Sequence, residues 1–87
     1  MTELREHLYR YTVAYLRIHG EARPCEAVAS FRRMFPIECK GYTDQVLRSK
    51  LTGTITKELN YYGPKAPIQR TGYRTIRLKE GFTWLEE

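Results

Sequence analysis

Long apolar runs are missing from this sequence, and their absence argues against a membrane-spanning helix. The apolar stretches cover only a few residues each, whereas a helix needs about 20 residues to cross a bilayer. Met1 to Glu6 lead directly into an amphipathic pattern, without the apolar core of a signal peptide. We therefore expect a cytoplasmic protein with no membrane partner, associated with the nucleoid or, in a eukaryotic host, located in the nucleus.

Cysteine and histidine are scarce, which argues against a metal site. Cys25 and Cys39 lack CxxC spacing, and no HxxxH pair occurs. His7 and His19 lie roughly 120° apart around the expected first helix, so their side chains do not converge. In a reducing compartment both cysteines are expected to behave as small apolar side chains. We expect no metal and no cofactor.

Catalytic motifs are also absent. The sequence contains no phosphate-binding loop, no nucleophile elbow and no paired acidic cluster. A tyrosine nucleophile for strand cleavage is conceivable, but 87 residues leave little room for the active site around it. We expect a protein without enzymatic activity.

What the sequence does contain is positive charge. Its 87 residues make one domain, in which nearly every apolar element shares one core. The net charge of +5 and the pI near 9.4 favour a polyanionic partner. Many basic proteins nevertheless have no nucleic-acid role, so charge alone does not decide the function.

Apolar spacing and the positions of glycine and proline predict an α+β fold. Arg23 precedes Pro24, which disfavours helix there and predicts a short extended segment over residues 21–23. One domain over residues 1–87 is expected, with helices over 3–18, 25–35 and 44–60, a hairpin over 67–78 and a final strand over 82–85. The expected core-facing residues are Leu4, Leu8, Tyr11, Tyr15 and Ile18 in the first helix, Ala27, Val28, Phe31, Met34 and Phe35 in the second, and Leu47, Leu51, Ile55 and Leu59 in the third.

The outer side of the third helix and the hairpin carry the candidate functional residues. At about 100° per residue, the side opposite the apolar row collects small hydroxyl residues and a glycine, flanked by lysines. Such a face can approach a phosphate backbone closely, and the hairpin adds arginines beside it. The candidate DNA-binding residues are Ser49, Lys50, Thr52, Gly53, Thr56, Lys57, Arg70 and Arg74.

The order of these elements resembles that of the winged helix-turn-helix fold over essentially the whole chain. That resemblance is one of architecture and implies a third helix that enters the major groove of DNA and a hairpin, the wing, that touches the flanking backbone. The connection between the second and third helices is longer than the tight turn of the simplest helix-turn-helix proteins. The segment over residues 82–85 is additional.

Each of these residues also has a structural interpretation. Gly53 suits close approach either to DNA or to another helix. The hydroxyls could form a plain polar face, and the hairpin arginines could simply be solvated. Tyr61, Tyr62 and Tyr73 could stack on unpaired bases, or they could cover the edge of the sheet.

Two functional hypotheses follow. The first is a transcriptional regulator that binds double-stranded DNA; the second is a protein–protein adaptor with the same fold, such as an assembly subunit or an inhibitor of a nucleic-acid enzyme. A second apolar sector of the first helix, formed by Tyr9, Val13 and Leu16, predicts a homodimer interface. The residues 82–85 could cover that sector instead and leave a monomer.

Overall fold

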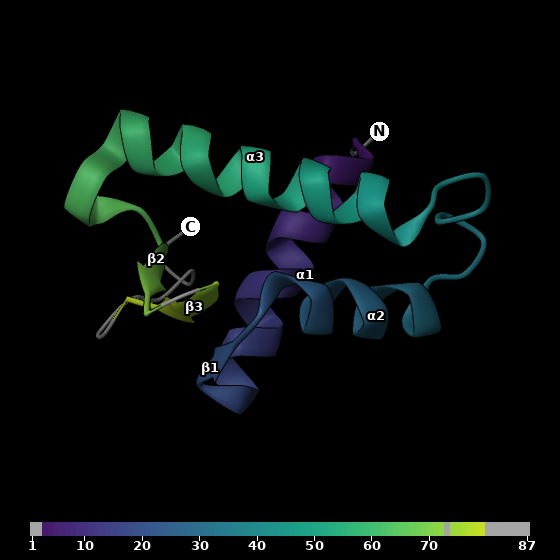
Figure 1. Cartoon of the computed structure of the whole chain (residues 1–87), viewed down its shortest axis with the longest axis horizontal. Helices are drawn as coiled ribbons and strands as arrows, with labels where there is room; N and C mark the ends of the chain where they lie inside the picture. Colours follow the sequence, from purple (N-terminus) through teal and green to yellow (C-terminus); the bar gives the residue numbers. More distant parts are fainter. Residues whose placement is uncertain (1–2, 73, 80–87) are drawn as a thin grey trace.

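A computed structural model describes residues 3–72 and 74–79 of the chain (Figure 1). It consists of three helices and a small antiparallel sheet that ends in a C-terminal hairpin, as the sequence predicts, and is compatible with a winged helix. The elements are α1 (Leu4–His19), β1 (Glu21–Ala22), α2 (Pro24–Met34), α3 (Asp44–Tyr62), a short 3-10 turn η1 (Gly63–Lys65), β2 (Ile68–Thr71) and β3 (Thr75–Leu78). The expected final strand over 82–85 lies outside the described residues.

Local signals place the ends of the helices. The Thr43 hydroxyl accepts a hydrogen bond from the Val46 N–H at 3.1 Å, so Thr43 caps α3. Pro24 occupies the first turn of α2, where its missing N–H is not needed. Gly20 and Gly63 end α1 and α3 with φ of 85° and 59°, a region that favours glycine. Among the described residues, no helix is both long enough and apolar enough to span a membrane.

Strand β3 of the hairpin is the central strand of a three-stranded sheet with the order β1-β3-β2. Ile68 pairs with Leu78 and Arg70 with Ile76, which places these four residues on one face of the sheet. Ile68 and Ile76 are buried there, whereas Arg70 is exposed. The short strand β1 joins the outer edge of β3, with Ala22 opposite Ile76. This pairing has a functional consequence, because it brings the start of α2 close to the hairpin.

The core lies where α1, α2, α3 and the sheet meet. The predicted row of α3 is confirmed for Leu47, Leu51 and Ile55, which are fully buried. Phe31 of α2 is also fully buried. Two expected core residues are instead exposed, Ile18 at 78% and Met34 at 63%, because each lies in the last turn of its helix, where no other element covers it.

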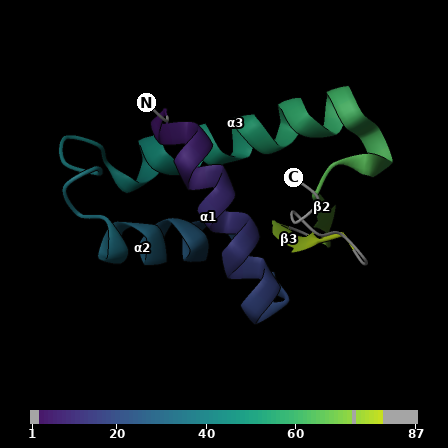
Figure 2. The ribbon, with the colours of Figure 1, turned by 180° about the vertical axis from the view of Figure 1, so that it is seen from behind.

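The three residues expected at a dimer interface belong to this core. Tyr9, Val13 and Leu16 are only 6%, 1% and 1% exposed within a single chain. Figure 2 shows why: α1 crosses α3 and runs between α2 and the sheet, so it is covered on more than one side. The prediction that these residues form a dimer interface is wrong, because a side chain buried within one chain cannot also meet a second copy. Dimerisation through another surface stays a prediction.

The connection between α2 and α3 is anchored by Cys39 in its middle and by Arg32 at its C-terminal end. Cys39 is fully buried, as a small apolar side chain would be, whereas Cys25 is exposed. Arg32 donates to the Asp44 carboxylate and to the Tyr42 carbonyl, each at 2.6 Å. These two hydrogen bonds fix the start of α3 against the end of α2, and they give Arg32 a role beyond the helix-end capping that its position suggests.

Candidate nucleic-acid interface

The candidate residues of α3 lie at the molecular surface, as the helical spacing predicts. Ser49, Gly53, Thr56 and Lys57 are exposed, and Thr52 is partly exposed. A Cβ atom added to Gly53 would meet nothing within 4 Å. The glycine therefore does not serve close packing against another of the described helices, and the space in front of it is open in the described part of the chain.

Two hydroxyls of this face are already used as donors within the helix. The Thr52 hydroxyl donates to the Arg48 carbonyl oxygen at 3.0 Å and lies 3.3 Å from the Ser49 carbonyl oxygen. The Thr54 hydroxyl donates to the Lys50 carbonyl oxygen at 2.8 Å. In this state each hydroxyl oxygen can only accept further hydrogen bonds. Phosphate oxygens are acceptors, whereas the amino groups of adenine and cytosine are donors in the major groove. Thr52 is thus better suited to a base edge than to a phosphate.

A groove of about 610 Å³ lies between α2, α3 and the hairpin. Four arginines line it: Arg23 before α2, Arg48 on α3, and Arg70 and Arg74 on the hairpin, and none of its described lining residues is acidic. We call it the arginine groove. Its remaining lining residues are Pro24, Cys25, Ser49, Thr52, Gly72, Thr75 and Ile76.

One hydrogen bond ties the hairpin to α3. The Arg70 guanidinium donates to the Thr56 hydroxyl at 2.7 Å. The hairpin is also held from the β1 side, where the Thr71 hydroxyl donates to the Glu21 carboxylate at 2.7 Å. Hydrogen bonds from Thr71 and Thr75 lower the pKa of Glu21, so this carboxylate is ionised beside the hairpin. Glu21 is not among the residues that line the arginine groove.

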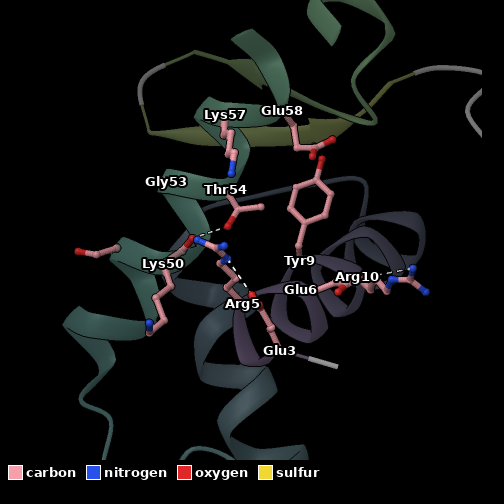
Figure 3. A pocket seen from close by; sticks show the side chains of 11 residues that line it. Glu3, Arg5, Glu6, Tyr9, Arg10, Lys50, Gly53, Thr54, Lys57 and Glu58 are labelled. Atoms are coloured by element: carbon pink, nitrogen blue, oxygen red, sulfur yellow. Dashed lines mark hydrogen bonds and ion pairs between the residues drawn. The ribbon is translucent and has the colours of Figure 1, made fainter. Parts of the chain in front are cut away.

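A second groove, of about 740 Å³, lies between the N-terminal half of α1 and the middle of α3 (Figure 3). We call it the α1–α3 groove. It contains Lys50, Gly53 and Lys57, whereas Thr52, Arg70 and Arg74 line the arginine groove. Ser49 lines both grooves, so it marks the ridge of α3 between them. The structure therefore divides the predicted site between two flanks of one helix.

Two arginines of the arginine groove, Arg23 and Arg48, were not among the predicted residues. Arg48 had a local signal, because it lies four residues before Thr52 and so on the same side of α3. Arg23 had none, because only the pairing of β1 with β3 brings it beside the hairpin. Tyr61 and Tyr62, at the end of α3, are 79% and 48% exposed, and Tyr73 lies outside the described residues.

Tyr9 has an unusual environment at the floor of the α1–α3 groove. Its hydroxyl is the one buried side-chain polar atom that lacks a hydrogen-bond partner in the described part of the chain. Burial, together with the negative charge of Glu58, raises the pKa of this hydroxyl. The nearby backbone of Ile68 has a smaller, opposite effect on the same pKa, without a hydrogen bond of ordinary geometry. The Tyr9 hydroxyl is thus neutral at physiological pH.

Tyr9→Phe is expected to leave the free energy of unfolding at neutral pH unchanged or to raise it by up to about 1 kcal/mol, because it removes an unpaired hydroxyl and keeps the ring. Above the ordinary tyrosine pKa of about 10, unfolded Tyr9 loses a proton that folded Tyr9 keeps, so stability should fall as pH rises. The free energy of unfolding of Tyr9→Phe should fall less steeply as pH rises. Urea titrations at neutral and alkaline pH measure both effects. A loss of stability at neutral pH would mean that the hydroxyl is hydrogen-bonded in the folded protein.

Comparisons of this chain with protein-family models, with curated proteins and with solved structures find no match. In the described ranges, no cluster of three or more histidine, cysteine or acidic residues could hold a metal ion.

Proposed function

We propose that this chain is a non-enzymatic protein that binds double-stranded DNA and acts as a transcriptional regulator. The observation that carries the proposal is the arginine groove: four arginines from three separate segments line one hollow beside α3, without an acidic residue among the described lining. A groove of one charge sign concentrates the opposite charge. The planar fork of arginine matches phosphate oxygens and the edge of guanine.

In this proposal α3 enters the major groove and the arginine groove holds the adjacent backbone. The Arg70–Thr56 hydrogen bond fixes the hairpin relative to α3. The residues proposed to contact phosphates and those proposed to contact bases therefore keep a fixed position relative to one another. Thr52 and Ser49, on the exposed side of α3, are the residues proposed to read base edges. Lys50 and Lys57, on the other flank of α3, are proposed to contact the second strand.

The second candidate function is that of a protein–protein adaptor. It is favoured by apolar side chains that the fold leaves uncovered, of which Ile37 at 82% and Met34 at 63% exposure lie near the end of α2. This patch is far from the arginine groove along α2, because that groove adjoins the start of the same helix. The two functions therefore predict different working surfaces.

A titration of random-sequence duplex DNA at several salt concentrations tests the proposed function. If each of the four arginines neutralises one phosphate, log K should fall with log salt at a slope of about −3.6, and lysine contacts would make it steeper. A slope near zero, or no binding in low salt, would contradict DNA binding and favour the adaptor.

A further inference from the structure

The arginine groove gathers positive charges that the described part of the chain does not neutralise. Arg23, Arg48 and Arg70 line it, and none of the three forms an ion pair with a described acidic residue. Arg70 instead donates to the neutral hydroxyl of Thr56. Like charges brought together in one hollow repel one another, and an anion placed between them would remove that repulsion.

Arginines elsewhere in the fold have acidic partners. Arg32 contacts the Asp44 carboxylate at 2.6 Å, and Arg5 contacts the Glu3 carboxylate at 3.3 Å. The fold therefore does place carboxylates beside arginines outside the groove. The lack of a carboxylate in the described lining of the arginine groove is a property of this site and not of every arginine on the surface.

The groove also has the size and shape of a small-molecule site. Its volume of about 610 Å³ lies within the range of roughly 300–1,000 Å³ that is usual for ligand pockets. The start of α2, the middle of α3 and the hairpin form its walls, so arginines reach it from three segments. A DNA duplex presents its phosphates on a convex backbone and meets the rim of such a hollow. A short polyanion can enter the hollow and contact arginines of different walls at the same time.

The number of arginines indicates how many charges that polyanion carries. A single phosphate carries at most about two negative charges and engages few arginine forks. A triphosphate carries about four negative charges at neutral pH, which matches the four arginines of the groove. In a nucleoside triphosphate, the base adds an aromatic face on which a guanidinium can stack.

We propose that the arginine groove binds a small triphosphate and that this ligand competes with DNA. Arg70, held in place by Thr56, and the arginines of the other walls contact the phosphate oxygens. A rise in triphosphate concentration then releases the protein from DNA. The competition rests on the proposed function, because both ligands must use the same arginines, whereas triphosphate binding does not.

The first experiment is a set of NMR titrations of the isotope-labelled whole chain, without DNA or divalent cations. The ligands are inorganic tripolyphosphate, a nucleoside triphosphate and inorganic phosphate. Both triphosphates should produce saturable shifts at Cys25, Thr52 and Gly72, which line the arginine groove, and much smaller shifts at Glu6 and Glu58 of the α1–α3 groove. Inorganic phosphate should bind at least about tenfold more weakly, because it reaches fewer arginines. Tighter binding of the nucleotide than of tripolyphosphate would identify the ligand as a nucleotide, and equal binding would identify it as a free polyphosphate.

Two variants that lose the same charge locate the triphosphate site. Arg48→Ala should weaken triphosphate binding by about tenfold, because it removes one charge-assisted contact. Arg33→Ala removes a charge near the end of α2, outside the groove, and should change the affinity far less. Both side chains are exposed, and the NMR spectrum of each free variant reports whether it is folded.

The second experiment adds tripolyphosphate to the complex of the protein with labelled duplex DNA. At a concentration equal to its own dissociation constant, a competitor should weaken the apparent affinity for DNA by about twofold. Sodium sulfate at the same ionic strength is the control for screening and should weaken it less.

The triphosphate site is refuted if neither triphosphate gives saturable shifts, or if Arg48→Ala and Arg33→Ala lose the same affinity. The competition is refuted if the triphosphate binds and DNA keeps its full affinity at equal ionic strength. If the chain binds no DNA in low salt, the proposed function fails, and the titrations without DNA still decide whether the triphosphate site exists.

Discussion

Replacement of Arg48 and Arg70 together by alanine is expected to weaken binding to random duplex DNA by about a hundredfold at low salt, or about tenfold for each lost phosphate contact. The slope of log K against log salt should become shallower by nearly two units, because two fewer counterions are released. Both side chains are exposed, so the variant should keep the overall fold. Arg70→Ala also removes the hydrogen bond to Thr56 that fixes the hairpin relative to α3, so Arg48→Ala alone is measured beside it and should show a loss of about tenfold and a slope change of about one unit. Binding measured by fluorescence anisotropy over a salt series gives both quantities.

A matched control separates the groove from overall charge. Arg33→Ala with Lys40→Ala removes the same charge from the far end of α2 and the connection that follows it, where neither side chain lines the arginine groove. That double variant should change affinity far less. If the two double variants lost the same DNA affinity, then net charge alone, and not the arginine groove, would account for binding.

The cysteines provide an independent readout of where DNA binds. Cys25 is exposed and lines the arginine groove, whereas Cys39 is fully buried. Bound DNA should therefore protect Cys25 from a maleimide reagent, and reaction of Cys39 would report unfolding. If Cys25 reacts at the same rate with and without saturating DNA, then the DNA lies elsewhere on the protein.

The sequence predicts the elements well because their signals are local. Thr43 marks the start of α3, Gly63 its end, and the spacing of Leu47, Leu51 and Ile55 its buried side. The hairpin likewise follows from short strands around Gly72. Each of these features depends on residues within a few positions of one another, which is the range over which sequence patterns act.

The parts that the sequence does not predict depend on which elements meet in space. The first helix has two apolar sectors, and the spacing of apolar residues cannot tell which sector packs against the rest of the chain. The structure buries Val13 and Leu16 because α1 is packed between α2 and the sheet, with α3 crossing it, and it leaves Ile18 at the uncovered end. Arg23 joins the arginine groove only through the pairing of β1 with β3. Long-range contacts decide both outcomes.

The core side of α2 depends on tertiary contacts in the same way. Phe31 is fully buried, and its ring centre lies 5.0 Å from that of His7, 5.4 Å from that of Tyr11 and 5.2 Å from that of Phe35. This cluster joins α1 to α2. The start of α2 carries Pro24 and Cys25 into the arginine groove, so the packing of Phe31 also positions the candidate interface.

Phe31→Ala is expected to lower the free energy of unfolding by about 3–5 kcal/mol, because the lost ring leaves a cavity in this cluster. A domain of this length has a total stability of roughly 4–13 kcal/mol, so the variant should lose between about a quarter of its stability and all of it. Urea denaturation followed by circular dichroism measures the change, with Met34→Ala as control. Met34 lies on the same helix but is 63% exposed, so its replacement should change stability by less than about 0.5 kcal/mol. If both variants lost the same small amount of stability, α2 would not be packed through Phe31.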